Sequence, residues 1–154
     1  MMELTKEQVQ IRKANNEDIP AMSCLWENLV LEENPEAKPN KEMWREQQKT
    51  YMMSDAYHPY VVVSNNLVVG FATGFAKIDL ENGEQYLEGG HMYVSPVYRK
   101  GKAGRMIHKM SVEVSKKIGA RFFRRYVSAA NERMMRRLTI KKYVIKGYLI
   151  DEEV

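Results

Sequence analysis

Residues 94–104 combine the end of a strand, a turn that contains glycine and basic residues, and the start of a helix. The apolar pattern of the strand ends near Val94, and helical spacing begins at about Ala103. The first N–H groups of a helix have no internal partner, so with the positive end of the helix dipole they favour an anion. Gly101 and Gly104 allow close approach of the backbone. The segment therefore predicts a phosphate-binding turn, or else a plain connection.

The charge distribution along the chain also favours an anionic ligand. Residues 1–98 carry 8 Lys or Arg and 15 Asp or Glu, whereas residues 99–146 carry 16 and 2. Side chains beside the turn add full charges to its amides: Arg99, Lys100, Lys102 and Arg105. So large an excess of basic residues indicates either a solvated helix face or a surface for a polyanion such as nucleic acid.

The same segment resembles the signature of the GNAT acyltransferases, which transfer an acyl group from acetyl-CoA to an amine. In that family a strand ending in Val leads through a short Pro-containing connection to Arg/Gln-x-x-Gly-x-Gly/Ala, which opens the helix that holds the CoA pyrophosphate. The residues here are Val94-Ser95-Pro96-Val97-Tyr98-Arg99-Lys100-Gly101-Lys102-Ala103-Gly104. Arg99 and Gly104 match the family pattern, whereas Lys102 occupies the inner glycine position.

The resemblance implies that acetyl-CoA is the co-substrate and binds along this strand and turn. The backbone of the strand end is expected to bond the pantetheine arm as a neighbouring strand would. The side chain of Asn131, at the head of a later helix, is also expected near the pantetheine. The cofactor-binding residues implied are Met92, Tyr93, Val94, Arg99, Lys100, Gly101, Lys102, Ala103, Gly104 and Asn131.

Glu88 is the residue expected to handle the proton. It lies six residues before Val94 and eleven before Arg99, which resembles the position of the general base in GNAT enzymes of the histone acetyltransferase type. An ammonium ion cannot attack a thioester until another group has accepted its proton, and a carboxylate suits that task. The alternative is that Glu88 is only an exposed strand residue. His91 is a second candidate base, although a lone strand histidine is often structural.

The family's usual acid is less well matched. Members carry a tyrosine after Asn131 that protonates the leaving CoA thiolate, and Leu138 occupies that position here. Lys142-Tyr143 occupies the later Gly-Phe position. Solvent, Tyr143 or Tyr126 would then act as the acid, and a thiolate with a pKa of about 8.5 makes an acid helpful but not indispensable.

The elements that position these residues follow from the hydrophobic pattern. Strands are expected over residues 9–14, 60–64, 67–76, 86–94, 121–128 and 143–150, the last as a strand or short hairpin. One helix is expected to start from a cap at Asn15 or Asn16 and to end at Asn34-Pro35. Further helices are expected over residues 41–53, 103–118 and 131–142. Asn65-Asn66 marks a hairpin, and the helix between strands 86–94 and 121–128 makes that pair parallel. Gly89-Gly90 is a candidate bulge that parts the two strands.

These elements predict one α/β domain over residues 1–154. The expected fold is of the GNAT type, with a mixed, mostly antiparallel sheet, one splayed parallel strand pair and flanking helices (an α+β arrangement). Cys24 is the single cysteine, so no intramolecular disulfide can form, and no residue cluster predicts a metal site. Without an apolar signal core or a bilayer-length apolar run, a cytoplasmic protein without membrane contact is expected.

The expected function is acetyl-CoA-dependent N-acetyltransfer to a primary amine of unidentified structure, by direct attack. Two alternatives stay open from the residues. One is a GNAT-like protein that acts on or binds nucleic acid through residues 99–146, and the other is a GNAT-like interaction module without catalysis. A homodimer in which the second subunit completes the sheet edge is a further expectation.

Overall fold

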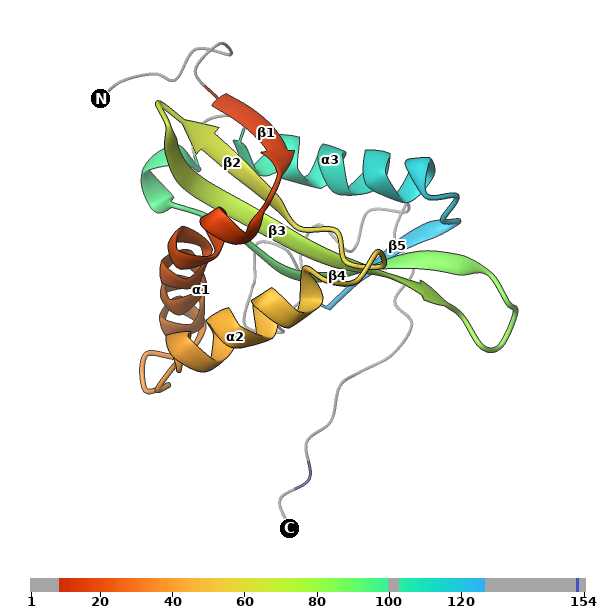
Figure 1. Cartoon of the computed structure of the whole chain (residues 1–154), viewed down its shortest axis with the longest axis horizontal. Coiled ribbons are helices and arrows are strands. Elements are labelled where there is room, and N and C mark those ends of the chain that lie inside the picture. Colours follow the sequence, from red (N-terminus) through yellow and green to blue (C-terminus); the bar gives the residue numbers. More distant parts are fainter. Residues whose placement is uncertain (1–8, 100–102, 127–151, 153–154) are drawn as a thin grey trace.

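The computed structural model describes residues 9–99, 103–126 and 152 (Figure 1). Its elements in chain order are β1 (Val9–Lys13), η2 (Asn16–Asp18), α1 (Ile19–Glu33), α2 (Lys41–Tyr51), β2 (Tyr60–Ser64), β3 (Leu67–Ile78), β4 (Gln85–Val94), η3 (Pro96–Tyr98), α3 (Ala103–Lys117) and β5 (Phe122–Arg125). The expected helix 131–142 and strand 143–150 lie outside the described residues.

The strands form one five-stranded sheet in the order β1-β2-β3-β4-β5. Each of the first three strands pairs antiparallel with the next, and β4 pairs parallel with β5. The helix α3 makes the crossover between the parallel strands, as such a pair requires. The mixed, mostly antiparallel sheet predicted from the sequence is confirmed.

Local signals explain where these elements begin and end. Asn65 and Asn66 have φ angles of 49° and 64°, the left-handed conformation that a two-residue hairpin between twisted strands needs. Asn15 and Asp18 form a reciprocal capping box, which caps η2 and delays the start of α1 to Ile19. Gly119, with φ of 77°, follows the end of α3.

The helices cover opposite faces of the sheet (Figure 1). α1 and α2 lie on one side, here called the α1/α2 face, and α3 lies on the other, the α3 face. Each face has its own buried cluster. The α1/α2 cluster is Ala14, Met22, Leu25, Trp44, Val61, Phe71 and Tyr93. The α3 cluster is Val62, Val69, Ala72, Val94, Ala103 and Ile107.

Aromatic rings make up much of the α1/α2 cluster. Trp44 is 4% exposed, stacks on Trp26 with ring centroids 5.4 Å apart and meets Phe71 edge-on at 6.0 Å. Offset and edge contacts of this kind are the arrangements that aromatic rings prefer. Trp44 is therefore a core residue, whereas Trp26 is only half-buried and reaches toward β4.

A bulge interrupts the pairing of β3 and β4 where the sequence predicts one. Gly74 pairs with Gly89 and Ala72 pairs with Met92, so three steps on β4 oppose two steps on β3. The amide of His91 donates a hydrogen bond of 3.0 Å to the hydroxyl of Thr73. A Cβ atom on Gly90 would lie only 2.4 Å from that hydroxyl oxygen, so the bulge needs glycine there.

We predict that Gly90→Ala destabilises the fold by displacing the Thr73 hydroxyl. The expected loss in the free energy of unfolding is about 1 kcal/mol, the low end for forced overpacking, because the site is at the surface. Urea unfolding of the wild type, Gly90→Ala, Thr73→Ala and the double variant measures it. The alanine at position 90 should cost less once Thr73 is alanine, and an equal cost in both backgrounds would contradict the steric explanation.

Candidate active site

The strands β4 and β5 part in the middle of β4. Their parallel pairing runs from Tyr86 opposite Phe122 to Gly89 opposite Arg125. Beyond that point, β4 pairs only with β3, as far as Val94. Within the described residues, no strand pairs with its other edge. The open edge of β4 from Gly90 to Val94 is called the wedge below.

The bulge places Glu88 and His91 on the same face of the sheet. In a regular strand, residues three apart point to opposite faces. Here Glu88 pairs with Phe75, which packs on Tyr51 of α2, and the ring of His91 meets Trp26 of α1. Both candidate bases therefore lie on the α1/α2 face, one on each side of the point where the strands part.

Glu88 is held by an ion pair that the sequence analysis missed. The Nζ atom of Lys77 on β3 lies 2.8 Å from Oε1 of Glu88, and the glutamate side chain is 22% exposed. Alternation along the β3–β4 hairpin could have revealed this partner, because Lys77 pairs with Tyr86, two residues from Glu88 on the same face.

Arg124 lies opposite Glu88 in the parallel register but binds elsewhere. Its guanidinium donates a 2.9 Å hydrogen bond to Asp79 and lies 4.2 Å from the ring centroid of Tyr86. Tyr86 itself stacks on Phe122 at 5.3 Å. These contacts join β5 to the β3–β4 hairpin and close the paired end of the wedge.

His91 presents a basic ring beside an indole. Its ring centroid lies 6.4 Å from that of Trp26 in an edge arrangement. Part of the residue stays exposed, but its neighbours withdraw the ring from water, and this desolvation lowers the pKa of His91 below its ordinary value of 6.5. The imidazole is therefore neutral at pH 7 and can accept a proton.

The backbone of β4 offers polar groups to the wedge. The amide of Ser95 bonds the carbonyl of Val69 on β3 at 2.8 Å. Because the backbone groups of successive strand residues point to opposite edges, those of Val94 and Met92 point toward the wedge, whereas those of Tyr93 point toward β3. Two of the three residues expected to bond the pantetheine thus present their backbone there.

Arg99 is engaged within the protein rather than free. Its Nε atom donates to the carbonyl of Val94 at 2.7 Å, and its Nη2 atom lies 2.8 Å from Oε2 of Glu32 on α1. The hydroxyl of Tyr93 also donates to Glu32, at 2.9 Å. Burial, followed by this hydrogen bond, raises the pKa of Tyr93. Glu32, which sequence reasoning missed, therefore ties α1 to the strand end and to the turn.

The start of α3 leaves room for a ligand at Gly104. Beyond its chain neighbours and the backbone of its own helix, no atom of the described residues lies within 4 Å of a Cβ atom built there, and its φ is not left-handed. Within this part of the chain, neither packing nor backbone conformation therefore requires glycine. Ala103 beside it is buried, and Arg105 is exposed. The remaining predicted cofactor residues lie outside the described part of the chain: Lys100, Gly101, Lys102 and Asn131. Leu138 and Tyr143 lie outside it too.

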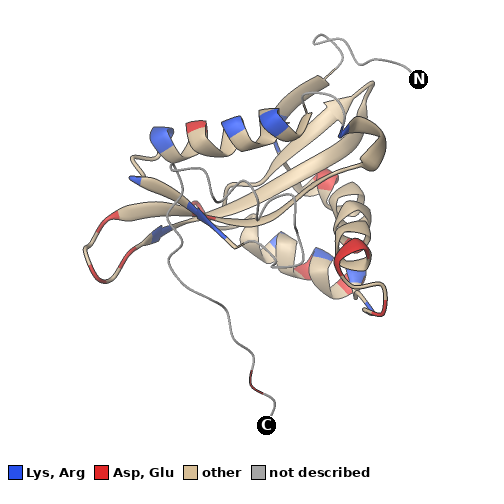
Figure 2. Cartoon of the chain, turned by 180° about the vertical axis from the view of Figure 1, so that it is seen from behind, with Lys and Arg blue, Asp and Glu red and all other residues tan. Residues whose placement is uncertain are grey.

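The basic surplus is partly neutralised in the described residues. Positions occupied by Lys or Arg recur along α3 (Figure 2). Arg99, Arg121 and Arg124, in contrast, form ion pairs with Glu32, Glu84 and Asp79. Part of the charge expected to meet a polyanion therefore stabilises contacts within the protein.

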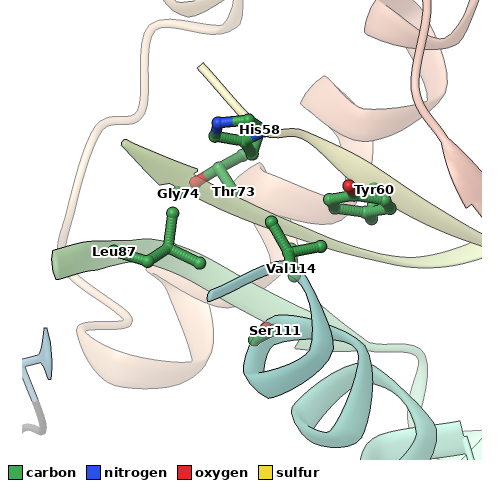
Figure 3. A pocket seen from close by; sticks show the side chains of 8 residues that line it. His58, Tyr60, Thr73, Gly74, Leu87, Ser111 and Val114 are labelled. Atoms are coloured by element: carbon green, nitrogen blue, oxygen red, sulfur yellow. The ribbon is translucent and has the colours of Figure 1, made fainter. Parts of the chain in front are cut away.

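A small recess lies on the other side of the sheet, between α3 and the strands β2 to β4 (Figure 3). It is lined by His58, Tyr60, Ala72, Thr73, Gly74, Leu87, Ser111 and Val114. Burial lowers the pKa of His58 and raises that of Tyr60. Because neither Glu88 nor His91 lines it, the recess is separate from the candidate active site.

The described residues contain neither a metal-ligand cluster nor a membrane-spanning helix. Among the described residues, no three His, Cys, Asp or Glu side chains are grouped as metal ligands would be. None of the helices in residues 9–99 and 103–126 is long and apolar enough to cross a membrane.

Solved structures share this architecture across nearly the whole chain. A possible acetyltransferase from Clostridium difficile 630 is 16% identical, with 96% of this chain and 98% of that chain covered and a TM-score of 0.78. A transcriptional regulator from Bacillus halodurans C-125 is 14% identical, with 95% and 99% covered and a TM-score of 0.80. Aminoglycoside N-acetyltransferase AAC(6′)-Iy in complex with CoA is 16% identical, with 95% and 94% covered and a TM-score of 0.73.

At these identities the likeness shows the fold, which is the GNAT fold predicted from the sequence. The comparison with curated proteins gave no match. The acetyltransferase (GNAT) family profile, however, matches residues 25–138, most of the chain. The match includes α2, the whole of β4, the basic turn and α3. The chain therefore belongs to the GNAT family of acetyltransferases.

Proposed function

We propose that this protein transfers the acetyl group of acetyl-CoA to a primary amine by direct attack. The observation that carries the proposal is the wedge, the edge of β4 that has no partner strand among residues 9–99 and 103–126 and that adjoins the face holding Glu88 and His91. A thioester bound along that edge would meet an amine bound on the α1/α2 face. The AAC(6′)-Iy structure with CoA and the family match support acetyl-CoA as the co-substrate.

The residues present fit CoA. Met92 turns its backbone polar groups toward the wedge, as a neighbouring extended chain would need, and Val94 turns its amide there, while its carbonyl accepts from Arg99. The open space at Gly104 lets a phosphate approach the first turn of α3, where the helix dipole favours negative charge. When bound, acetyl-CoA supplies an acetyl group that is already activated as a thioester.

The chain's own groups would then manage the proton and the charge. The ammonium would lose one proton to Glu88, and the amine nitrogen would then bond the acetyl carbon. As the C–S bond breaks, the nitrogen would release its second proton to solvent, and the departing thiolate would take up a proton from solvent. A backbone N–H at the wedge stabilises the negative charge that develops on the carbonyl oxygen. The hydrogen bond from Lys77 goes to Oε1 of Glu88, so Oε2 would be the oxygen that accepts the proton of the incoming ammonium.

We predict that Glu88→Gln lowers kcat/KM by about a hundredfold, the usual contribution of a general base, because the amide cannot accept the proton. Affinity for CoA should not change, since the substituted side chain lies on the α1/α2 face. Steady-state kinetics with a panel of primary amines, together with calorimetric titration of CoA, measures both. Full activity in this variant combined with loss in His91→Gln would assign the base to His91.

Gly104→Ala should weaken CoA binding without harming the fold. Among the described residues, the added methyl group meets no atom outside its own helix and chain neighbours, and alanine raises helix stability by up to about 1 kcal/mol, so thermal stability should hold or rise. The same methyl group would obstruct a phosphate at the first turn of α3, and we expect at least a tenfold loss of affinity, about 1.4 kcal/mol. Unchanged affinity would show that the pyrophosphate binds elsewhere.

Glu32→Gln should strengthen CoA binding several-fold. The substitution removes the carboxylate that holds Arg99, so the guanidinium becomes free to meet phosphate, as the family pattern implies for this position. Because the Glu32–Arg99 pair is exposed, stability should fall by only about 1 kcal/mol or less. Glu33→Gln is the control, since Glu33 is an exposed neighbour of the same charge. An equal gain in both variants would point to net charge alone.

The cationic amine acceptor, the homodimer, the cytoplasmic location and the nucleic-acid partner stay predictions. For nucleic acid, the pairing of Arg99, Arg121 and Arg124 with acids reduces the number of free cations in the described part of the basic segment. Binding to duplex DNA or RNA, measured as a function of salt, would test that partner directly.

A further inference from the structure

The ion pair at Glu88 brings a primary amine to the proposed base. Lys77 lies on β3 with its side chain 47% exposed, and its Nζ atom is 2.8 Å from Oε1 of Glu88. Its Cα atom pairs with Tyr86, so the side chain runs diagonally toward the point where β4 and β5 part. An amine of the protein itself thus occupies the α1/α2 face beside the wedge.

We propose that Lys77 is a self-acetylation site, modified within its own chain by acetyl-CoA bound at the wedge. The inference rests on the proposed function. The Nζ ammonium gives one proton to Glu88, the nitrogen bonds the acetyl carbon, and the nitrogen releases a second proton to solvent as the C–S bond breaks. CoA leaves as a thiolate that is protonated by solvent, and Lys77 becomes a neutral acetamide.

Acetylation would remove the positive charge of Lys77 as well as block its amine. The hydrogen bond to Glu88 raises the pKa of Lys77, so the free lysine stays an ammonium until a base takes its proton. The modification rate should therefore rise with pH. Acetyl-lysine cannot form the ion pair, so the modified chain leaves Glu88 without its cationic neighbour on β3.

Lys49 provides a matched comparison within the same chain. Its Nζ atom also lies 2.8 Å from a carboxylate oxygen, that of Glu46, and its side chain is 59% exposed against 47% for Lys77. The two lysines thus have similar exposure and the same kind of partner. Lys49, however, lies on α2 and pairs with a helix residue, not with β4. Uncatalysed acetylation by acetyl-CoA should therefore affect both lysines, and only Lys77 should be acetylated faster because acetyl-CoA binds at the wedge beside it.

The experiment incubates the full-length protein with acetyl-CoA and no other amine, and follows intact mass and peptide mapping over time. We expect about one acetyl group per chain, located at Lys77, with a rate at least tenfold above that at Lys49 and independent of protein concentration. Lys77→Arg should abolish the modification, Glu88→Gln should slow it about tenfold or more, and Lys49→Arg should leave the Lys77 rate unchanged.

Three results would overturn the inference: modification of Lys77 no faster than that of Lys49, an unchanged rate in Glu88→Gln, or a rate that scales with protein concentration. A parallel assay of acetyl-CoA consumption with a panel of primary amines separates this inference from the proposed function. If acetyl-CoA is consumed with the amines but Lys77 is not acetylated, self-acetylation alone is overturned. If a folded protein neither consumes acetyl-CoA nor becomes acetylated, both self-acetylation and the proposed function are overturned.

Discussion

The hydrogen bond from the His91 amide to the Thr73 hydroxyl marks the place on which the site depends. At this position the ladder between β3 and β4 takes up one extra residue, and only glycine at position 90 fits against the hydroxyl. The extra residue brings Glu88 and His91 to one face and bends β4 as it leaves β5. A strand without the bulge would keep its ladder but turn one of these side chains to the α3 face.

The paired end of the wedge is held by contacts that differ in kind from those at the open end. Tyr86 stacks on Phe122, and Arg124 covers both rings. Two ion pairs connect the turn residues Asp79 and Glu84 to Arg124 of β5 and to Arg121 just before it. At the open end, the polar groups are those of the backbone and of Arg99. The sheet thus combines a well-packed β4–β5 pair with the open edge of β4 in the wedge, along which an extended ligand could pair as a strand would.

Periodicity and turn chemistry predicted most of the fold. The hairpin at Asn65-Asn66, the bulge at Gly90, the parallel crossover and the ends of α3 follow from local residue preferences, so a single sequence suffices for them. The ion pair of Glu88 with Lys77 depends on the register of the β3–β4 hairpin, and alternation along that hairpin could have revealed it. The engagement of Arg99 could not be predicted in the same way, because its partner Glu32 lies far along the chain and its position is fixed only once the sheet and α1 have packed together.

The hydrogen bonds of the Glu32 carboxylate connect two parts of the site. Its carboxylate joins α1, on the side where an acceptor would bind, to Arg99 and Tyr93 at the strand end where a cofactor would bind. In a thermodynamic cycle, a ligand that shifts α1 and alters this contact must change the affinity of the other ligand by a certain factor, and the reverse effect has the same size. One surface carboxylate thereby makes the two halves of the site energetically dependent, without any contact between their ligands.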